Sequence, residues 1–501
     1  MYTDVLLTDL YQLTMMQGLY FEGKHEQRCV FDRYYRKNPF SGGYTVVAGL
    51  EHLIDYVENL HFNEDDMAYL ASTGIFKPEF LDYLKGIRFT GNIYAMPEGT
   101  VAFPQEVLLR VETKKAEALL LETCMSMIMN HESLIATKAR RVRTVAGNDV
   151  LMEFGLRRAQ GKSAGVYGAR AAFIGGFNGT SNVYAGACFG IPVFGTMAHS
   201  WIMSFPTELD AFRAYARQYD DNLILLADTY NTLKQGVPDA ITVFKELRDA
   251  GKLPARYGIR LDSGDLAYLS KEAGKMFAAA GFDDIISASN DLDENLISGL
   301  KLQGSLINSW GVGTNLITSK DSPSMGGVFK LVGQYEGDTF VPKIKLSDNA
   351  EKISNPGRKN VFRLYDKDTG KMKADIIALE GETISTDTAF HLVADSMPWR
   401  YRTVPAGSFT VRTMLEPIFR NGKLVYKKQS QLLGRLRQEN RLNLRGGPSL
   451  SEICDYAERE IETLWPEYLR LINPEEMRVQ RSAKLSELRQ DVLRKESANF
   501  L

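Results

Sequence analysis

Six short apolar runs, each ending in polar or glycine residues and each followed by a helical pattern, dominate the chain from about residue 150 onward. The spacing of these runs leaves room for one strand, one helix and the loops that join them. Strands and helices that alternate in this way predict a parallel sheet with helices packed against it. The runs are VLMEFGLRR, PVFGTMAHS, NLILLADTY, YGIRLDSGD, DIISASND and LINSWGVGTN, and they begin near residues 150, 192, 222, 257, 284 and 306.

The first run is not followed by the GxGxxG pattern of a dinucleotide-binding sheet. Six strand–helix steps therefore favour an irregular (β/α) barrel. Barrel enzymes place their active sites at the carboxyl ends of the strands, where loops from several strands converge. We expect the polar ends of the six runs to line one pocket.

A chain of 501 residues is too long for one compact core, so we expect three parts. The first has a helical pattern, strand-like runs around PFSGG, and two more short helices; the last combines a hairpin pattern, VFRLYDKDTGKMKADIIAL, with charged helices from about residue 450. The predicted parts are an N-terminal α+β domain (1–128), the barrel (129–345) and a C-terminal β-hairpin and helical extension (346–501).

Charge and cysteine content exclude several classes of protein. The 60 Lys and Arg residues balance 62 Asp and Glu residues, which predicts no affinity for nucleic acid or for an anionic membrane. No apolar run reaches the roughly 18 residues of a membrane span. Four scattered cysteines without a CxxC pair, and acidic residues where a signal peptide carries basic ones, predict a cytoplasmic protein with reduced thiols.

The ends of the six runs offer arginines, carboxylates, hydroxyls, one histidine and a glycine-rich turn. This combination suits a phosphorylated sugar together with an ionised second substrate, because arginine binds phosphate or carboxylate and aspartate binds ribose hydroxyls or Mg²⁺. The candidate residues are Arg157, Arg158, Thr196, His199, Asp228, Arg260, Asp262, Ser289, Asn290, Gly311, Gly313 and Thr314.

Several of these residues could instead have a purely structural role that involves no ligand. Gly-x-Gly-Thr at Gly311–Thr314 suits a phosphate, since backbone N–H groups can approach its oxygens, but glycine also occurs at any tight turn. The paired arginines could form surface ion pairs. Asp228 could cap the following helix, whereas in RLDSGD the better cap is Asp265, which leaves Asp262 for a ligand.

His199 is the one histidine of six that follows a predicted strand among small polar residues. It could act as a base, contact a phosphate, or simply be hydrogen-bonded at the rim of the barrel.

Eight motifs, in this order, resemble those of the nicotinate phosphoribosyltransferase family: LTDLYQLTM, FGLRRAQG, GTMAHS, LADTY, RLDSGD, SNDLDE, GVGTN and GGVFKLV. The resemblance runs from about residue 3 to residue 333 and is weaker beyond. It implies an N-terminal α+β domain, an irregular α/β barrel, a C-terminal extension and a homodimer with a shared active site. It also implies the joining of nicotinate to phosphoribosyl pyrophosphate in NAD salvage, giving nicotinate mononucleotide and pyrophosphate.

The same resemblance implies a role for each candidate residue. ATP would be a co-substrate that phosphorylates His199 transiently, and Mg²⁺ would be bound through Asp262 or Asp228, the two acids placed at the ribose. Thr196 and Arg260 would contact nicotinate, and Tyr11, from the TDLYQ motif, would stack on its ring, although a core tyrosine is the plain alternative. The phosphate-binding residues would be Arg157, Arg158, Ser289, Asn290, Gly311, Gly313 and Thr314.

Two rival enzymes remain. The first is a nicotinamide phosphoribosyltransferase with the same fold; Leu261 and Asp265, in LDSGD, favour the enzyme that uses the acid. The second is a sugar-phosphate lyase or aldolase on a barrel, which would need a Schiff-base lysine or a metal triad, and the six run ends contain no lysine. A shorter quinolinate-using enzyme and a nucleotide-sensing pseudoenzyme fit less well.

Overall fold

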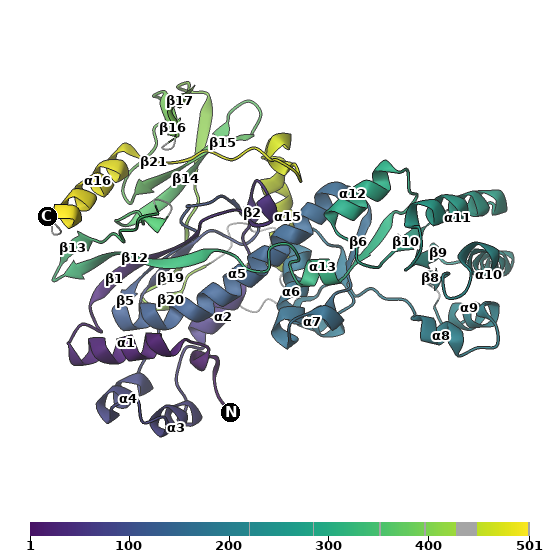
Figure 1. Cartoon of the computed structure of the whole chain (residues 1–501), viewed down its shortest axis with the longest axis horizontal. Coiled ribbons are helices and arrows are strands. Elements are labelled where there is room, and N and C mark those ends of the chain that lie inside the picture. The colour runs from purple at the N-terminus through teal and green to yellow at the C-terminus, as the bar shows by residue number, and fades with distance from the viewer. Residues whose placement is uncertain (220, 284, 350–351, 395–396, 427–447, 499–501) are drawn as a thin grey trace. The chain divides into compact units, whose positions relative to one another are not determined.

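The computed structural model describes residues 1–219, 221–283, 285–349, 352–394, 397–426 and 448–498 (Figure 1). The chain forms two compact units. The first unit comprises residues 1–137 and 324–501, and the second comprises residues 138–323. The units meet within one long helix, α5 (Lys115–Ala146), and the predicted boundary between residues 128 and 129 falls inside the same helix. The three-part division remains a prediction.

A seven-stranded sheet with the order β13-β12-β1-β5-β3-β19-β20 forms the framework of the first unit. Strand β1 (Arg28–Tyr35) lies antiparallel between β12 and β5, and seven of its eight residues are buried. This explains why RCVFDRYY lacks the alternation of a half-exposed strand. The other strands are β3 (Asn92–Ala95), β5 (Leu109–Lys114), β12 (Gly327–Glu336), β13 (Thr339–Pro342), β19 (Glu416–Arg420) and β20 (Lys423–Leu424), and β2 (Thr45–Val46) pairs separately with β4 (Val101–Ala102).

The predicted helices of the N-terminal part are confirmed. Helix α3 begins with a capping box, in which Asn63 and Asp66 each bond the other's backbone N–H. The helices of this part are α1 (Leu10–Phe21), α2 (Leu50–Glu58), α3 (Glu64–Ser72) and α4 (Pro78–Lys85), with the 3₁₀ turns η1 (Asp4–Leu6) and η2 (Pro39–Ser41).

The predicted C-terminal hairpin is confirmed as β14 (Lys359–Asp366) and β15 (Met372–Leu379), joined by a turn that contains Asp-Thr-Gly. Its sheet is completed by β18 (Phe409–Thr413) and β21 (Val479–Arg481). The remaining elements are β16 (Phe390–Ala394), β17 (Met397–Val404), α15 (Leu450–Glu462), η6 (Pro466–Leu469) and α16 (Ala483–Ala498).

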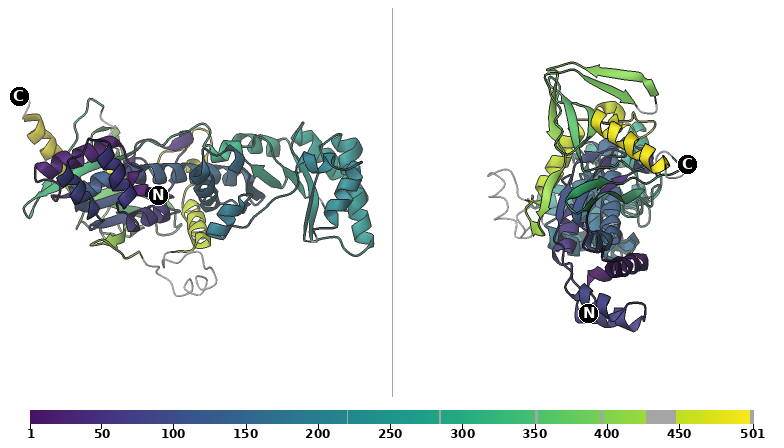
Figure 2. Two further views of the ribbon diagram at one scale, coloured as in Figure 1. Left: turned by 90° about the horizontal axis from the view of Figure 1, so that it is seen from below. Right: turned by 90° about the vertical axis from the view of Figure 1, so that its left-hand side faces the viewer.

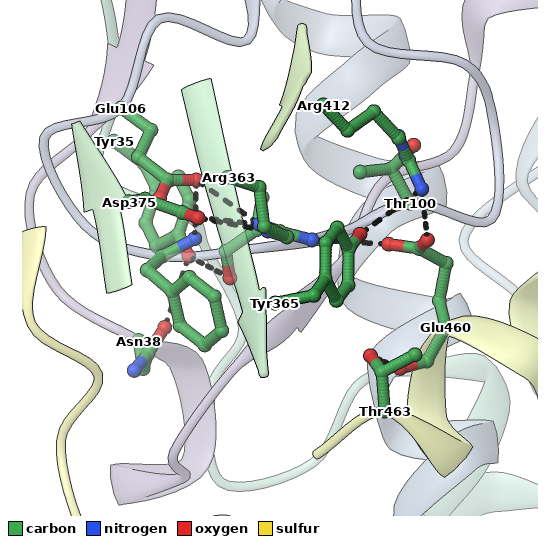
Figure 3. Close-up of polar contacts among 12 residues, drawn as sticks. Tyr35, Asn38, Thr100, Glu106, Arg363, Tyr365, Asp375, Arg412, Glu460 and Thr463 are labelled. Carbon is green, nitrogen blue, oxygen red and sulfur yellow. Dashed lines mark hydrogen bonds and ion pairs between the residues drawn. The ribbon is translucent and has the colours of Figure 1, made fainter. Parts of the chain in front are cut away.

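A buried ionic cluster joins this hairpin to α15 and to the N-terminal segment (Figure 3). Arg363 of β14 is fully buried and donates to Asp375 of β15 at 2.6 Å and to Glu460 of α15 at 3.0 Å. Glu106 lies beside them, and burial together with the negative charge of Asp375 raises its pKa well above the usual range. Segments about 250 residues apart in sequence therefore share one set of charges.

The second unit is a parallel sheet with helices, as the repeated runs predict. Its strand order is β7-β6-β11-β10-β9-β8, and every pairing is parallel. Five of the six runs supply strands, and the irregular (β/α) architecture is confirmed. The strands are β6 (Val150–Glu153), β7 (Gly179–Thr180), β8 (Asn222–Leu226), β9 (Arg256–Leu261), β10 (Ile286–Ala288) and β11 (Ser309–Val312).

One predicted strand is wrong. The run PVFGTMAHS forms an isolated bridge between Val193 and Thr180 of β7, and no strand is assigned to it. Gly190 lies just before the run and Gly195 lies within it, and neither glycine supplies a side chain to pack. His199 consequently begins a short helix, α8 (His199–Met203), rather than ending a strand.

Helix α10 (Val237–Asp249) packs against β9 and contacts α9 (Glu208–Ala216) and α11 (Leu266–Ala280) (Figures 1 and 2). The core between them is apolar, with Leu225, Ile259, Phe244 and Phe277 fully buried. The helices of this unit are α6 (Lys162–Ile174), α7 (Val183–Phe189), α8 (His199–Met203), α9 (Glu208–Ala216), α10 (Val237–Asp249), α11 (Leu266–Ala280), α12 (Glu294–Leu302) and α13 (Thr314–Ile317), with the turns η3 (Leu156–Arg158) and η4 (Thr232–Gly236). In the described part of the chain, no helix is both long and apolar enough to cross a membrane.

Candidate active site

Two carboxylates meet at the carboxyl ends of the neighbouring strands β8 and β9. Asp228 lies two residues beyond β8, and its Oδ2 accepts hydrogen bonds from the backbone N–H of Asp262 at 2.9 Å and from Ser263 Oγ at 2.6 Å. Asp262 directly follows β9, and its Oδ1 accepts a hydrogen bond from Ser289, which directly follows β10. Parallel pairing of three strands thus brings residues from three separate runs together.

The RLDSGD segment turns sharply because of Gly264, whose φ of +80° is a conformation that side chains disfavour. The turn separates the two acids of the motif. Asp265 caps α11 by accepting a hydrogen bond from the N–H of Tyr268 at 3.0 Å, so the predicted cap is confirmed. Asp262 remains at the end of the strand. Asp228 accepts a hydrogen bond from the backbone N–H of Asp262 in this turn and does not cap a helix.

Arg260, near the end of β9, is held from the GTMAHS segment. It donates to Thr196 Oγ1 at 2.7 Å and to the carbonyl oxygen of Met197 at 2.8 Å. Its Nε is buried and has no hydrogen-bond partner among the described residues. Burial lowers the pKa of Arg260, while the nearby carboxylates Asp262 and Asp228 oppose that shift. Such a guanidinium still has donor capacity for an anion.

His199 is half-buried at the first position of α8, and its ring lies between two of these strand ends. Nδ1 lies 3.1 Å from Thr229 Oγ1, within hydrogen-bond distance. Nε2 lies 3.9 Å from Asp262 Oδ2, which is an ion-pair distance but too long for a hydrogen bond. The predicted proximity of His199, Arg260 and Asp262 is therefore present in the structure.

The glycine-rich turn follows β11, on the other side of β10 from β9. Gly313 precedes α13, and Thr314 is the first residue of that helix. A Cβ on Gly311 would lie 2.5 Å from the ring of Phe154, so this glycine has a packing reason that involves no ligand. Asn290, after β10, has a left-handed φ of +87°. Turns of this kind occur at ligand-binding loops, where backbone strain is held by the surrounding structure.

The paired arginines lie in the 3₁₀ turn η3 immediately after β6, and both are exposed. Arg157 is close enough to Arg260 for its charge to contribute to the lowered pKa of Arg260. The structure thus brings Arg157 into the same electrostatic environment as the carboxylates. Arg158 is adjacent in the turn.

Tyr11 belongs to the other compact unit. It lies on α1 with 51% of its surface exposed, and its hydroxyl accepts a hydrogen bond from Gln12 at 2.9 Å. Burial of its hydroxyl and the charges of Glu122 and Asp9 raise the pKa of Tyr11. The core alternative for Tyr11 is therefore wrong within this chain, because half of the residue faces solvent.

Glu208 is a buried acid near the site that the sequence pattern did not reveal. It is the first residue of α9 and is completely buried, and neither carboxyl oxygen has a hydrogen-bond partner within the described residues. Burial, together with the negative charges of Asp239 and Asp228, raises the pKa of Glu208 to about 7. Glu208 follows Thr207, an ordinary helix cap, so its position resembles that of any first-turn acid.

The donor set at the strand ends fits a Mg²⁺ ion that is shared with a phosphorylated substrate. Asp228 Oδ1 is buried and has no hydrogen-bond partner among the described residues. Within those residues, no group of three or more His, Cys, Asp or Glu side chains could hold a metal ion alone. Mg²⁺ in proteins often takes one or two carboxylates and completes its shell with water and substrate phosphate, which matches Asp228 with Asp262.

Three sequence profiles match most of the chain. The nicotinate phosphoribosyltransferase N-terminal domain matches residues 6–130, the nicotinate phosphoribosyltransferase family matches residues 150–333, and the C-terminal domain matches residues 358–489. A nicotinate phosphoribosyltransferase of Bacillus subtilis (strain 168) is 42% identical over 94% of this chain and 91% of its own length. The chain belongs to the nicotinate phosphoribosyltransferase family. Its members are enzymes, as the resemblance of the eight motifs predicts.

Other members of the family are similar to this chain over nearly its whole length. The nicotinate phosphoribosyltransferase of Homo sapiens is 32% identical over 96% of this chain and 95% of its own length. The crystal structure of human nicotinic acid phosphoribosyltransferase superimposes with a TM-score of 0.81 at 29% identity, over 97% of this chain and 99% of that one. A nicotinate-nucleotide pyrophosphorylase from Pyrococcus furiosus shares the fold, with a TM-score of 0.66 at 22% identity.

Proposed function

We propose that the chain joins nicotinate to phosphoribosyl pyrophosphate, forming nicotinate mononucleotide and pyrophosphate, and couples this reaction to ATP hydrolysis. The observation that carries the proposal is the position of Arg260: a half-buried cation, held by Thr196 and Met197, beside the carboxylates of two strand ends. The names of the relatives and the family membership support the same reaction. The product would enter NAD salvage.

Nicotinate would bind through its carboxylate. Arg260 would donate to that carboxylate, because a guanidinium provides several N–H groups in one plane and Nε has no partner among the described residues. Thr196 would contact the same substrate, since its hydroxyl is already bonded to Arg260. Tyr11 would stack on the pyridine ring from the neighbouring subunit of a homodimer, in which the active site is shared.

Phosphoribosyl pyrophosphate would bind along the row of strand ends. Arg157 and Arg158 would hold the pyrophosphate, and the backbone at Gly313 and Thr314 would hold the 5′-phosphate. Ser289 and Asn290 would lie beside the ribose phosphate, and Gly311 would allow the chain to pass close to Phe154.

Displacement at the anomeric carbon develops positive charge on the ribose. Asp262 would stabilise that charge, while Asp228 would bind ribose hydroxyls, and arginines would stabilise the leaving pyrophosphate. Mg²⁺, held through Asp262 or Asp228, would neutralise phosphate oxygens when it is bound. The pyridine nitrogen carries no proton at neutral pH, so the attack needs no general base.

His199 is therefore available for a different task. We assign it the transient phosphoryl group from ATP, which would add roughly −1.5 to −2 charges beside Arg260 and Asp262. A charge of that size would attract arginines and reorganise the loops around the substrates. The four scattered cysteines, Cys29, Cys124, Cys188 and Cys454, include no CxxC pair, which supports a reducing, cytoplasmic location.

A rate comparison tests the proposal. The purified protein is supplied with phosphoribosyl pyrophosphate and either nicotinate or nicotinamide, with and without ATP, and pyrophosphate release is followed. We expect release with nicotinate, stimulation by ATP, and little turnover of nicotinamide, which lacks the negative charge that Arg260 binds. Equal use of both bases would contradict the role of Arg260, and a preference for nicotinamide would favour the rival phosphoribosyltransferase.

The role of His199 is tested separately. His199→Asn removes the nitrogen that would accept the phosphoryl group but keeps a polar side chain of similar reach. We expect this variant to lose the stimulation by ATP. If the ATP-stimulated rate were unchanged, His199 would not carry the coupling.

A further inference from the structure

Hydroxyl groups form hydrogen bonds with three titratable side chains of the site, His199, Asp228 and Asp262, in a repeated arrangement around the sheet. The Thr229 hydroxyl, after β8, lies within hydrogen-bond distance of His199. The Ser263 hydroxyl, after β9, donates a hydrogen bond to Asp228, and the Ser289 hydroxyl, after β10, donates one to Asp262. In each case the hydroxyl comes from a strand end that follows the bonded group in the chain. Of these three hydroxyls, only that of Thr229 contacts the histidine.

The contact with Thr229 distinguishes the two ring nitrogens of His199. A neutral imidazole has one N–H donor and one nitrogen with a free lone pair. Nδ1 is 3.1 Å from the Thr229 hydroxyl, whereas Nε2 is 3.9 Å from the nearest carboxylate oxygen, that of Asp262. The side chain of His199 is 40% exposed, so its packing alone leaves the ring room to rotate.

The backbone around His199 adds little constraint on the ring. Helix α8 has only five residues, His199 is the first of them, and the preceding residue, Ala198, makes no side-chain cap. Thr229, in contrast, is anchored three residues beyond a fully buried end of β8 at Leu226. The buried strand end therefore fixes the position of the Thr229 hydroxyl, whereas the short helix α8 places few restraints of its own on the ring of His199.

We propose that Thr229 is the positioning residue for His199: its hydroxyl accepts a hydrogen bond from Nδ1–H and so presents Nε2 as the nitrogen that receives a phosphoryl group. The proposal rests on the proposed function. In the step, the Nε2 lone pair forms a bond to the γ-phosphorus of ATP, and the bond from that phosphorus to the bridging oxygen breaks. ADP leaves with the electron pair, and the ring keeps its Nδ1 proton, hydrogen-bonded to Thr229.

Thr229→Val tests this proposal, because valine keeps the branched shape of threonine and removes the hydroxyl. Phosphohistidine formation is measured with ATP labelled at the γ-phosphate. We expect the initial rate to fall about tenfold, since the loss of one such hydrogen bond corresponds to a change of about tenfold in rate. Thr229→Ser, which restores the hydroxyl, should recover most of that rate.

The matched control is Thr242→Val, which removes a hydroxyl bonded only to the backbone of Pro238 in α10. It should leave the phosphorylation rate unchanged. Thermal unfolding of every variant separates a loss of positioning from a loss of folding. If Thr229→Val were phosphorylated at the wild-type rate, or if Thr229→Ser were as slow as the valine variant, the proposal would be overturned.

A second readout does not depend on ATP. ¹⁵N chemical shifts of the labelled histidines report which ring nitrogen of His199 carries the proton, and the His199→Asn spectrum assigns that signal among the six histidines. We expect the Nδ1–H form in the wild type and a mixture in Thr229→Val. An Nε2–H form in the wild type would refute the proposal, whereas a wild type that forms no phosphohistidine but shows Nδ1–H would refute only the proposed coupling to ATP.

Discussion

Arg260 has two kinds of partner, a hydroxyl and a backbone carbonyl on one side and carboxylates on the other. Arg260→Gln should therefore lower kcat/KM for nicotinate by roughly 10- to 150-fold, because a hydrogen bond to a charged group contributes about 1.5–3 kcal/mol. The weak rate with nicotinamide should change much less. Steady-state kinetics with both bases check this, and an equal loss for the two bases would point to damage of the site instead.

Glu208 predicts a pH dependence of stability. Its pKa is raised from 4.5 to about 7 in the folded protein, so the folded state binds more protons than the unfolded state between these values. The free energy of unfolding must then fall as the pH rises from 4.5 through 7, by at most roughly 3 kcal/mol at 1.36 kcal/mol per pKa unit.

Glu208→Gln keeps the shape of the side chain and cannot ionise. Relative to the wild type, we expect it to unfold at a higher temperature at pH 8 and to differ less at pH 5. Differential scanning calorimetry at both pH values measures this. A variant that lost stability equally at the two values would show that the Glu208 carboxyl is instead satisfied as an anion.

At the scale of elements, the turn between β9 and α11 depends on one glycine. Gly264→Ala places a Cβ at φ +80° and 2.9 Å from Leu269, which should cost about 1 kcal/mol or more and shift Asp262. Gly299→Ala is the control, since its Cβ would meet nothing within 4 Å inside α12 and should stabilise the helix by roughly 0.5–1 kcal/mol. Urea unfolding together with kcat separates the two effects, and equal behaviour of both variants would contradict the strained turn.

The elements also show how far local patterns reach. Helices α2 and α3, the hairpin β14–β15 and five parallel strands follow from periodicity, caps and turn residues. The conformation of the run at Pro192–Ser200 could not be predicted from the sequence pattern, because its apolar residues resemble those of the runs that do form strands. Its conformation is decided by the single bridge of Val193 to Thr180 and by the contacts of Thr196 and Met197 with Arg260, and these are tertiary contacts.

At the scale of the molecule, the ionic cluster of Arg363 links the C-terminal hairpin, α15 and Glu106 within the first unit (Figure 3). Arg363→Met should lower the free energy of unfolding by about 3–5 kcal/mol, because Asp375 would be left buried without its cation and Glu460 would keep only its ion pair with Arg412. The control Arg494→Met removes an exposed ion pair with Asp491 and should change stability by less than about 1 kcal/mol. Chemical denaturation measures both variants, and comparable effects would mean that the cluster contributes no more than a surface pair.

The sequence by itself determined the alternation of strands and helices, the acids and arginines at the strand ends, and the family to which the motifs belong. These properties are local, since they depend on residue spacing and on the order of short motifs. Only the tertiary structure decided that Thr229 contacts His199, that Glu208 is buried without a partner, and that Arg363 is shared by three segments. Such contacts depend on which surfaces exclude water once distant segments pack, and no spacing within one segment contains that information.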